Sequence, residues 1–161
     1  MLQALLAERF NLVVRRETRE QPVYAMVTAH ENGRLGPQLK RSTTDCSSKA
    51  PADPIGPCTM GGSFIGRGGS LQGIGQPLTQ LATHLGTAAD RIVLDRTGLA
   101  GTFDFTLTWK SGGFGVSRVG AADDGPSLFT AVQEQLGLKL ESARGPVDVL
   151  VIDSVTRPTP D

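Results

Sequence analysis

An amphipathic helix that runs directly into an apolar strand occurs three times along this chain, and this repeated phrase constrains the fold most. The first copy spans residues 5–14 and the last spans residues 131–140. A degraded copy with Leu81, Leu85 and Gly86 lies between them. Because one such unit cannot bury its apolar face alone, repetition predicts that the copies pack against each other around a shared core.

Helices that alternate with strand pairs favour an α+β fold in which the helices pack on one face of a largely antiparallel sheet. We expect a single domain built from repeated helix–β-hairpin units. The expected boundaries are 1–161 for the domain, about 1–29, 63–110 and 126–156 for the units, and 30–62 and 111–125 for flexible loops. The loops are rich in glycine, proline and polar residues, which interrupt regular structure.

Hairpins are predicted in the first and last units. Residues 12–19 and 23–29 read as strands that flank a proline-containing break, which indicates a first hairpin. Residues 138–142 and 147–155 flank a glycine–proline turn, which indicates another. Both predictions depend on the local turn residues.

The helices and the clearest strand are predicted from periodicity and capping residues. Pro77 suits the first turn of a helix, and Ser127 suits an N-cap. Asn11 and Gly137 suit the ends of the first and last helices. Alternation of apolar and polar residues from Thr102 to Trp109 predicts a strand with one buried face. The residues expected on the buried helix faces are Leu2, Leu5, Leu6 and Phe10 in the first helix, Leu78, Leu81, Ala82 and Leu85 in the second, and Leu128, Phe129, Val132 and Leu136 in the third.

Composition argues against several classes of partner. The chain has 16 Lys and Arg residues against 16 Asp and Glu residues, so no net field favours nucleic acid or an anionic membrane. No apolar run approaches the roughly 20 residues of a membrane helix, so no membrane span is expected. A protein or peptide partner remains the class that the composition permits.

Two cysteines lie in the proline-rich stretch, at Cys46 and Cys58. Two ligands are too few for a closed zinc site, and neither His30 nor His84 shows ligand spacing to them. The spacing also differs from the redox motif C-x-x-C. The favoured interpretation is a disulfide that holds a loop without a core of its own and stabilises the fold by roughly 2–3 kcal/mol. Such a bond predicts an oxidising compartment.

Carboxylates are the main candidates for catalysis. Asp95 and Asp104 flank a segment expected to form a tight hairpin, where together they could bind calcium or another divalent cation. Such an ion could polarise a carbonyl for hydrolysis. Alternatively, Asp95 caps its turn and Asp104 is solvated or salt-bridged. His84 is a further catalytic candidate, for which a solvated imidazole at a helix end is the alternative.

Glycine clusters do not predict a nucleotide site. Residues 66–69 and 113–115 lack the Gly-Lys-Ser/Thr ending of a phosphate loop, and neither cluster joins a buried strand to a helix. We therefore expect turns at Gly68-Gly69 and at Gly73. No serine lies in a nucleophile elbow.

Three phrases together resemble a known family. They are residues 2–20, residues 95–105 and residues 127–140. The chain resembles the soil-associated family of uncharacterised proteins abundant in acidobacterial genomes. The resemblance implies an exported protein with a leader and an upstream segment that this sequence lacks, and it implies no activity or site residues. It supports the disulfide and predicts a periplasmic or secreted location.

The last phrase is also similar to the short N-terminal domains of secretins and TonB-type outer-membrane receptors, which bind peptides or partner proteins. We therefore predict a non-enzymatic, extracytoplasmic binding module without a cofactor, whose strand edges offer β-augmentation. The alternative is a small metal-assisted hydrolase of an ester or lactone that uses Asp95 and Asp104.

Overall fold

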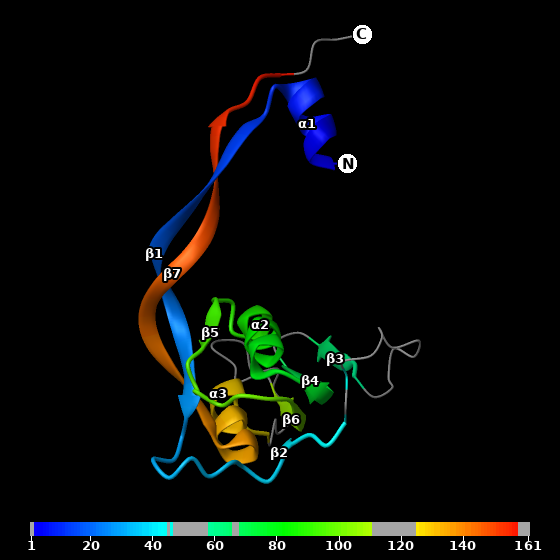
Figure 1. The fold of residues 1–161 in the computed structure, drawn as a ribbon, viewed down its shortest axis with the longest axis vertical. Helices are drawn as coiled ribbons and strands as arrows, with labels where there is room; N and C mark the ends of the chain where they lie inside the picture. The colour runs from blue at the N-terminus through cyan, green and yellow to red at the C-terminus, as the bar shows by residue number, and fades with distance from the viewer. Residues whose placement is uncertain (1, 45, 47–57, 66–67, 111–124, 158–161) are drawn as a thin grey trace, which may run out of the picture. The chain divides into compact units, whose positions relative to one another are not determined.

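The computed structural model describes residues 2–44, 46, 58–65, 68–110 and 125–157. The chain divides into two compact units, one formed by residues 1–21 with 144–161 and the other by residues 22–143. Figure 1 shows the elements, which are α1 (Leu2–Phe10), β1 (Val13–Thr28), β2 (Leu39–Arg41), β3 (Met60–Ile65), β4 (Gly68–Gln76), α2 (Leu78–Ala88), β5 (Val93–Asp95), β6 (Phe103–Trp109), α3 (Leu128–Ala131), the π-helical turn η1 (Val132–Leu136) and β7 (Leu138–Ser154). The α+β class is confirmed.

The strands belong to two sheets, where one was expected. The first sheet has the order β5-β1-β7, and the second has the order β2-β6-β4-β3. β1 and β5 are parallel, with Tyr24 opposite Val93, whereas every pair in the second sheet is antiparallel. A strand does follow each helical segment, at β1, β5 and β7. The single domain, the repeat itself and the packing of all helices on one face stay predictions.

The two predicted terminal hairpins are wrong, because β1 and β7 are each continuous and pair with each other. Pro22 does not break β1, since β5 pairs with this strand only from Tyr24 to Met26 and no described strand needs an N–H there. Gly145 likewise lies inside β7. Each predicted hairpin is therefore replaced by pairing between segments that are distant in the sequence.

The unit formed by the chain ends contains α1, residues 13–21 of β1 and residues 144–154 of β7. As the sequence suggests, α1 stops at Asn11, which adopts the left-handed conformation with φ of 45°. The N–H of Thr156 donates to the carbonyl of Phe10 over 2.8 Å. Leu6 and Phe10 are half-buried, but Leu5 is 52% exposed, so the predicted apolar face of this helix is narrower than expected.

The core of the other unit lies on one face of the second sheet. The alternation predicted for β6 is confirmed, because Phe103, Phe105, Leu107 and Trp109 are buried. The predicted face of α2 is confirmed as well. These residues share one cluster with Leu128, Val132 and Leu136. Phe129 is 42% exposed, contrary to expectation, because it lies one position from the buried Leu128 and packs the edge of its ring against Tyr24.

Local signals at the ends of the last helix are confirmed. The hydroxyl of Ser127 accepts a hydrogen bond from the N–H of Thr130 over 3.2 Å, which is the expected N-cap. Gly137 ends η1 in the left-handed conformation, with φ of 68°. The π-helical hydrogen bonding of η1 was not predicted.

β4 runs through the glycines that were expected to form turns. Its Gly69 lies opposite Trp109, and its Gly73 lies opposite Phe105. A Cβ built on Gly73 would lie 2.5 Å from the ring of Phe105, and one on Gly69 would lie 2.8 Å from the ring of Trp109. These glycines therefore make room for aromatic rings that fold across the strand pair. The turn prediction is wrong at both positions.

Candidate functional site

The predicted carboxylate pair is divided between the two sheets. Asp95 ends β5, where its Oδ1 accepts hydrogen bonds from the N–H and the hydroxyl of Thr97 over 3.0 and 2.8 Å. Asp104 lies on β6, where its Oδ1 accepts the N–H of Gly75 over 2.9 Å. β5 and β6 do not pair, so the expected hairpin is wrong. Asp95 therefore stabilises the turn that follows β5, and Asp104 joins β6 to the end of β4.

The remaining candidates for metal or acid–base chemistry are also dispersed. His84 is half-buried within α2, and His30 is exposed after β1. Over residues 2–44, 46, 58–65, 68–110 and 125–157, no group of three or more His, Cys, Asp or Glu side chains could hold a metal ion. Catalysis by Asp95, Asp104 or His84 stays a prediction.

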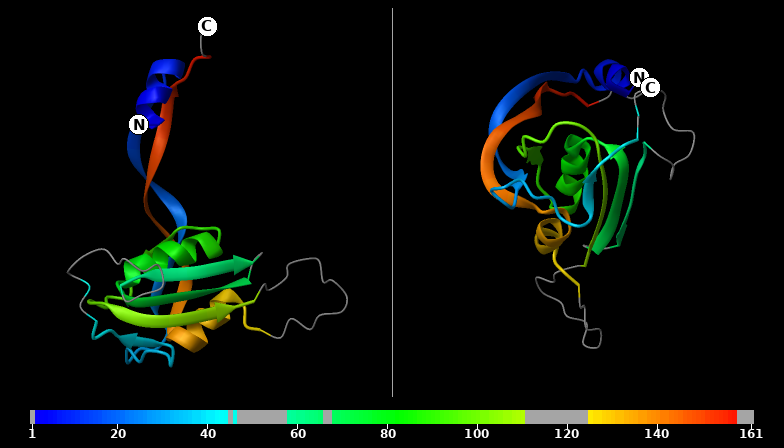
Figure 2. Two further views of the ribbon diagram at one scale, coloured as in Figure 1. Left: turned by 90° about the vertical axis from the view of Figure 1, so that its right-hand side faces the viewer. Right: turned by 60° about the horizontal axis from the view of Figure 1, so that its bottom comes forward.

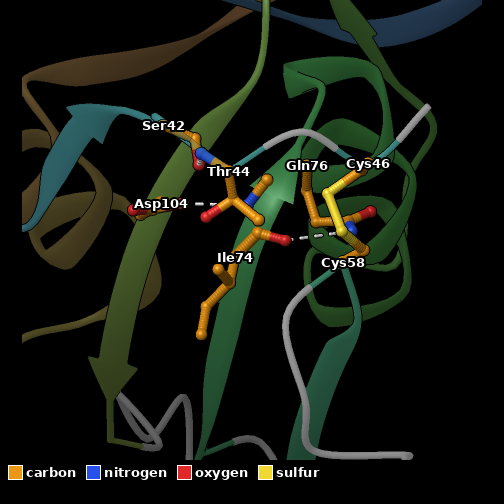
Figure 3. The surroundings of a disulfide bond; sticks show 8 residues. Ser42, Thr44, Cys46, Cys58, Ile74, Gln76 and Asp104 are labelled. Atoms are coloured by element: carbon orange, nitrogen blue, oxygen red, sulfur yellow. Dashed lines mark hydrogen bonds between the residues drawn. A yellow bond between two sulfur atoms is a disulfide. The ribbon is translucent and has the colours of Figure 1, made fainter. Parts of the chain in front are cut away.

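The predicted disulfide is confirmed. Cys46 and Cys58 are bonded, with their Cα atoms 5.4 Å apart and a sequence separation of 12. The bond lies beside the start of β3, where the N–H of Cys58 donates to the carbonyl of Ile74 on β4 over 3.1 Å (Figure 3). A Cβ on Gly75 would overlap the sulfur of Cys46, so only glycine fits against the bridge. The disulfide therefore ties Cys58, beside the start of β3, to Cys46, and the bridge packs against the end of β4 at Gly75.

The outer face of the second sheet is polar. Thr106 on β6 lies opposite Gln72 on β4, which in turn lies opposite Gly61 on β3. In the next row, Thr108, Ser70 and Ser63 are opposite one another across the same three strands. Strands β3, β4 and β6 run side by side in Figure 2. These rows present hydroxyl and amide groups to solvent, because the apolar residues of β6 point to the core.

Two neighbouring cavities follow this face. The larger has a volume of about 400 Å³ and is lined by Thr59, Gly61, Gly62, Ser63, Ser70, Gln72 and Ile74. The smaller has a volume of about 300 Å³ and is lined by Pro37, Gln38, Lys40, Gln72, Gly73, Ile74, Asp104, Phe105 and Thr106. The described residues that line the larger cavity include no charged side chain, and they lie along β3 and β4.

The side of β6 that faces away from β4 has its backbone groups satisfied along the strand, and we call this side the closed edge. β2 pairs with β6 only as far as Phe105. Beyond that point the carbonyl of Gln38 accepts the N–H of Thr106 over 3.1 Å. The side-chain amide of Gln135 then bonds the N–H and the carbonyl of Thr108 over 3.0 and 2.7 Å. The carboxamide thus satisfies both backbone groups, as a neighbouring strand would.

The other edge, which we call the open edge, is the outer side of β3 (Met60–Ile65). β3 pairs with β4, and no other strand among the described residues pairs with it. Its sequence contains neither a charged residue nor a proline. Natural proteins protect edge strands with charged residues or proline, or by covering them. The open edge carries none of these protections within its own sequence.

The hydrogen-bonding pattern shows which groups point outward. The N–H of Ile74 donates to the carbonyl of Thr59 over 3.3 Å, so Thr59 faces β4. In an antiparallel ladder the bonded pairs alternate, which directs Gly61 and Ser63 to β4 as well. Met60 and Gly62 therefore direct their N–H and carbonyl groups to the open edge. These groups are the chemistry that an added strand requires.

The geometry thus defines an α+β protein with a disulfide-anchored, open β-sheet edge. The chain belongs to the family described as protein of unknown function (DUF3738), whose model matches residues 1–155. No curated protein and no solved structure matches the chain. In the part of the chain that the structure describes, no helix has the length and apolar character to cross a membrane.

The residues that define the two edges were not singled out from the sequence. The open edge had a signal, because residues 59–65 contain neither charge nor proline and include the apolar Met60 and Phe64. No local sequence signal indicated the role of Gln135, since its partner Thr108 is 27 residues away.

Proposed function

We propose that this chain is a binding module that captures an extended peptide segment as an additional strand on the open edge of β3. The observation that carries this proposal is the contrast between the edges. The chain uses Gln38 and the amide of Gln135 to satisfy the far side of β6, whereas β3 leaves its outward groups to an external partner. Strand addition uses backbone hydrogen bonds for affinity and side-chain pockets for selectivity.

The disulfide supports the rest of the proposal. Disulfides persist mainly in oxidising compartments, so we place the protein in the periplasm or outside the cell. The resemblance to the soil-associated, exported family of acidobacterial genomes supports the same location. The similarity of residues 127–140 to the short N-terminal domains of secretins and TonB-type receptors supports peptide binding.

The test uses one acetylated, amidated heptapeptide of alternating threonine and valine, and the same peptide with every backbone nitrogen methylated. Methylation removes the donors of the peptide, and its bulk prevents close approach to a strand edge. We expect the unmethylated peptide to bind the full chain and to shift the amide NMR signals of Met60 and Gly62. The methylated peptide should not bind.

The closed edge supplies an internal control, because the amide of Thr108 should not shift on binding. Binding of both peptides with equal affinity would overturn the proposal. So would shifts centred on Thr106 and Thr108, and so would the absence of binding by either peptide.

A further inference from the structure

The open edge contains a slot at Gly61. Gly61 is exposed, and a Cβ built on it would meet no atom within 4 Å. Thr59 and Ser63 flank it along β3, and Gln72 lies opposite on β4. They line the cavity of about 400 Å³, within the range of roughly 300–1,000 Å³ typical of ligand sites. The cavity thus has room for a large side chain from a strand on the free side of β3.

The lining restricts the chemistry of that side chain. Among the described residues, the cavity is lined by hydroxyl, amide and apolar groups and by no charged side chain. A charged side chain placed there would lose water without gaining a counter-charge, which is unfavourable. The slot therefore selects for an uncharged side chain.

The same sheet shows how a glycine is covered by a neighbouring strand. On the inner face, the ring of Phe105 lies over Gly73, directly opposite on β4. The ring of Trp109 lies over Gly69 in the same way. In both pairs an aromatic side chain covers the backbone that the glycine leaves bare, a device known to stabilise glycine in sheets.

We infer that the peptide bound at the open edge carries an aromatic side chain opposite Gly61. This inference rests on the proposed function. A strand added to β3 places one residue directly opposite Gly61, with its Cβ toward the outer face. A ring at that residue lies over Gly61 and between Thr59 and Ser63, as Phe105 lies over Gly73. An aromatic side chain buries roughly 150–250 Å² of surface. This area is larger than the contact that the small residues lining the cavity make with each other.

The experiment compares four heptapeptides of alternating threonine and valine that differ only in the central residue, which is phenylalanine, leucine, alanine or lysine. With the unmodified chain we expect the phenylalanine peptide to bind about tenfold more tightly than the alanine peptide, equivalent to about 1.4 kcal/mol. Leucine should be intermediate and lysine weakest. The phenylalanine ring should also shift the α-proton signals of Gly61 upfield.

The variant Gly61→Val fills the slot without disturbing the fold, because no atom lies within 4 Å of the new Cβ. It should reduce the preference for phenylalanine over alanine to about twofold or less. Gln80→Val introduces the same side chain on the exposed surface of α2 and should keep the tenfold preference.

The outcomes separate the two proposals. If the phenylalanine and alanine peptides bind equally and methylation abolishes both, the open edge binds strands and the aromatic inference is wrong. If Gly61→Val keeps the full preference, the ring lies elsewhere and the inference is again wrong. If no peptide of the series binds, the proposed function itself fails.

Discussion

The two edges of the four-stranded sheet solve the same physical problem in opposite ways. At the closed edge β2 is only three residues long, and Gln38 and Gln135 satisfy the backbone of β6 beyond it. At the open edge β3 pairs over six residues with β4, and the described chain places no strand beyond it. An unpaired edge is a liability in water, and the proposed strand addition accounts for this difference between the two edges.

The edges also differ in how they are anchored. The residues beside the closed edge belong to the core, because Leu136 and Phe105 are buried on either side of it. Among the β3 residues whose burial is described, 60–63, Met60 is the one that packs against that core as a partly buried side chain. The hydrogen bonds to β4 and the disulfide at Cys58 therefore hold β3 in place. A strand held in this way is accessible on its outer side and depends strongly on its anchor.

Removing the disulfide should have the largest effect, and it should act on the open edge. The double variant Cys46→Ala/Cys58→Ala should lower the free energy of unfolding by about 3 kcal/mol, since the bridge closes a short loop in the unfolded chain. Amide hydrogen exchange in β3 should accelerate, whereas exchange at Thr108 should change only with global stability. Urea unfolding and residue-resolved exchange measure the two effects.

A matched variant separates the effect of losing the disulfide from the effect of the backbone conformation at Cys58. This residue has φ of 69°, in the left-handed region that favours glycine. Cys46→Ala/Cys58→Gly should therefore be about 1 kcal/mol more stable than the double alanine variant. Equal stability of the oxidised chain and both variants would show that the disulfide does not anchor β3.

Removing the side chain that satisfies the closed edge should lower the free energy of unfolding less than removing the disulfide does. Gln135→Ala removes two hydrogen bonds to Thr108, each worth about 1 kcal/mol, and water can replace part of them. We expect a loss of about 1–2 kcal/mol in urea unfolding and concentration-dependent association in light scattering. Gln133→Ala, at an exposed position of η1, is the control and should remain close to the unmodified chain. A Gln135→Ala chain that is as stable and as monodisperse as this control would remove the distinction between the edges.

Sequence reasoning succeeded where a short-range pattern decides the structure. The buried face of α2, the alternation of β6, the Ser127 cap and the stop at Gly137 each depend on residues within a few positions of one another. The separation of Cys46 and Cys58, with a zinc site and a redox motif excluded, also indicated the disulfide. These features follow from periodicity, capping and turn chemistry, which one sequence displays.

The wrong predictions share one cause, which is that each residue interacts with a segment distant from it in the sequence. Pro22 and Gly145 resemble breaks until β1 pairs with β7. Gly69 and Gly73 resemble turns until the rings of β6 cover them. The same limit applies to the candidate site. Asp104 bonds the N–H of Gly75 across 29 residues, so its local setting gave no indication of that role.

A third edge, in the unit formed by the chain ends, extends the comparison and gives the smallest prediction. There β1 carries Arg15, Glu17 and Arg19, and Glu17 forms ion pairs with both arginines over 2.7 and 3.0 Å. Charge is thus a further way to protect a strand edge. The hydrogen bond from Arg19, with a further one from Arg15, lowers the pKa of Glu17 from its ordinary value of 4.5.

The sign of the pH dependence follows from this shift. Because the folded chain binds the Glu17 proton less readily than the unfolded chain, the carboxylate adds stability above the ordinary pKa. That stability is lost as the pH falls below 4.5 and through the lower folded pKa. We expect Glu17→Gln to accelerate amide exchange of β1 slightly at pH 7 and to have no effect once the pH lies below the lowered pKa of Glu17 in the folded chain. High salt should reduce the difference at pH 7, because these groups are solvent-accessible. A difference that persists in acid would mean that Glu17 acts through packing, and the charged edge would then no longer contrast with the open one.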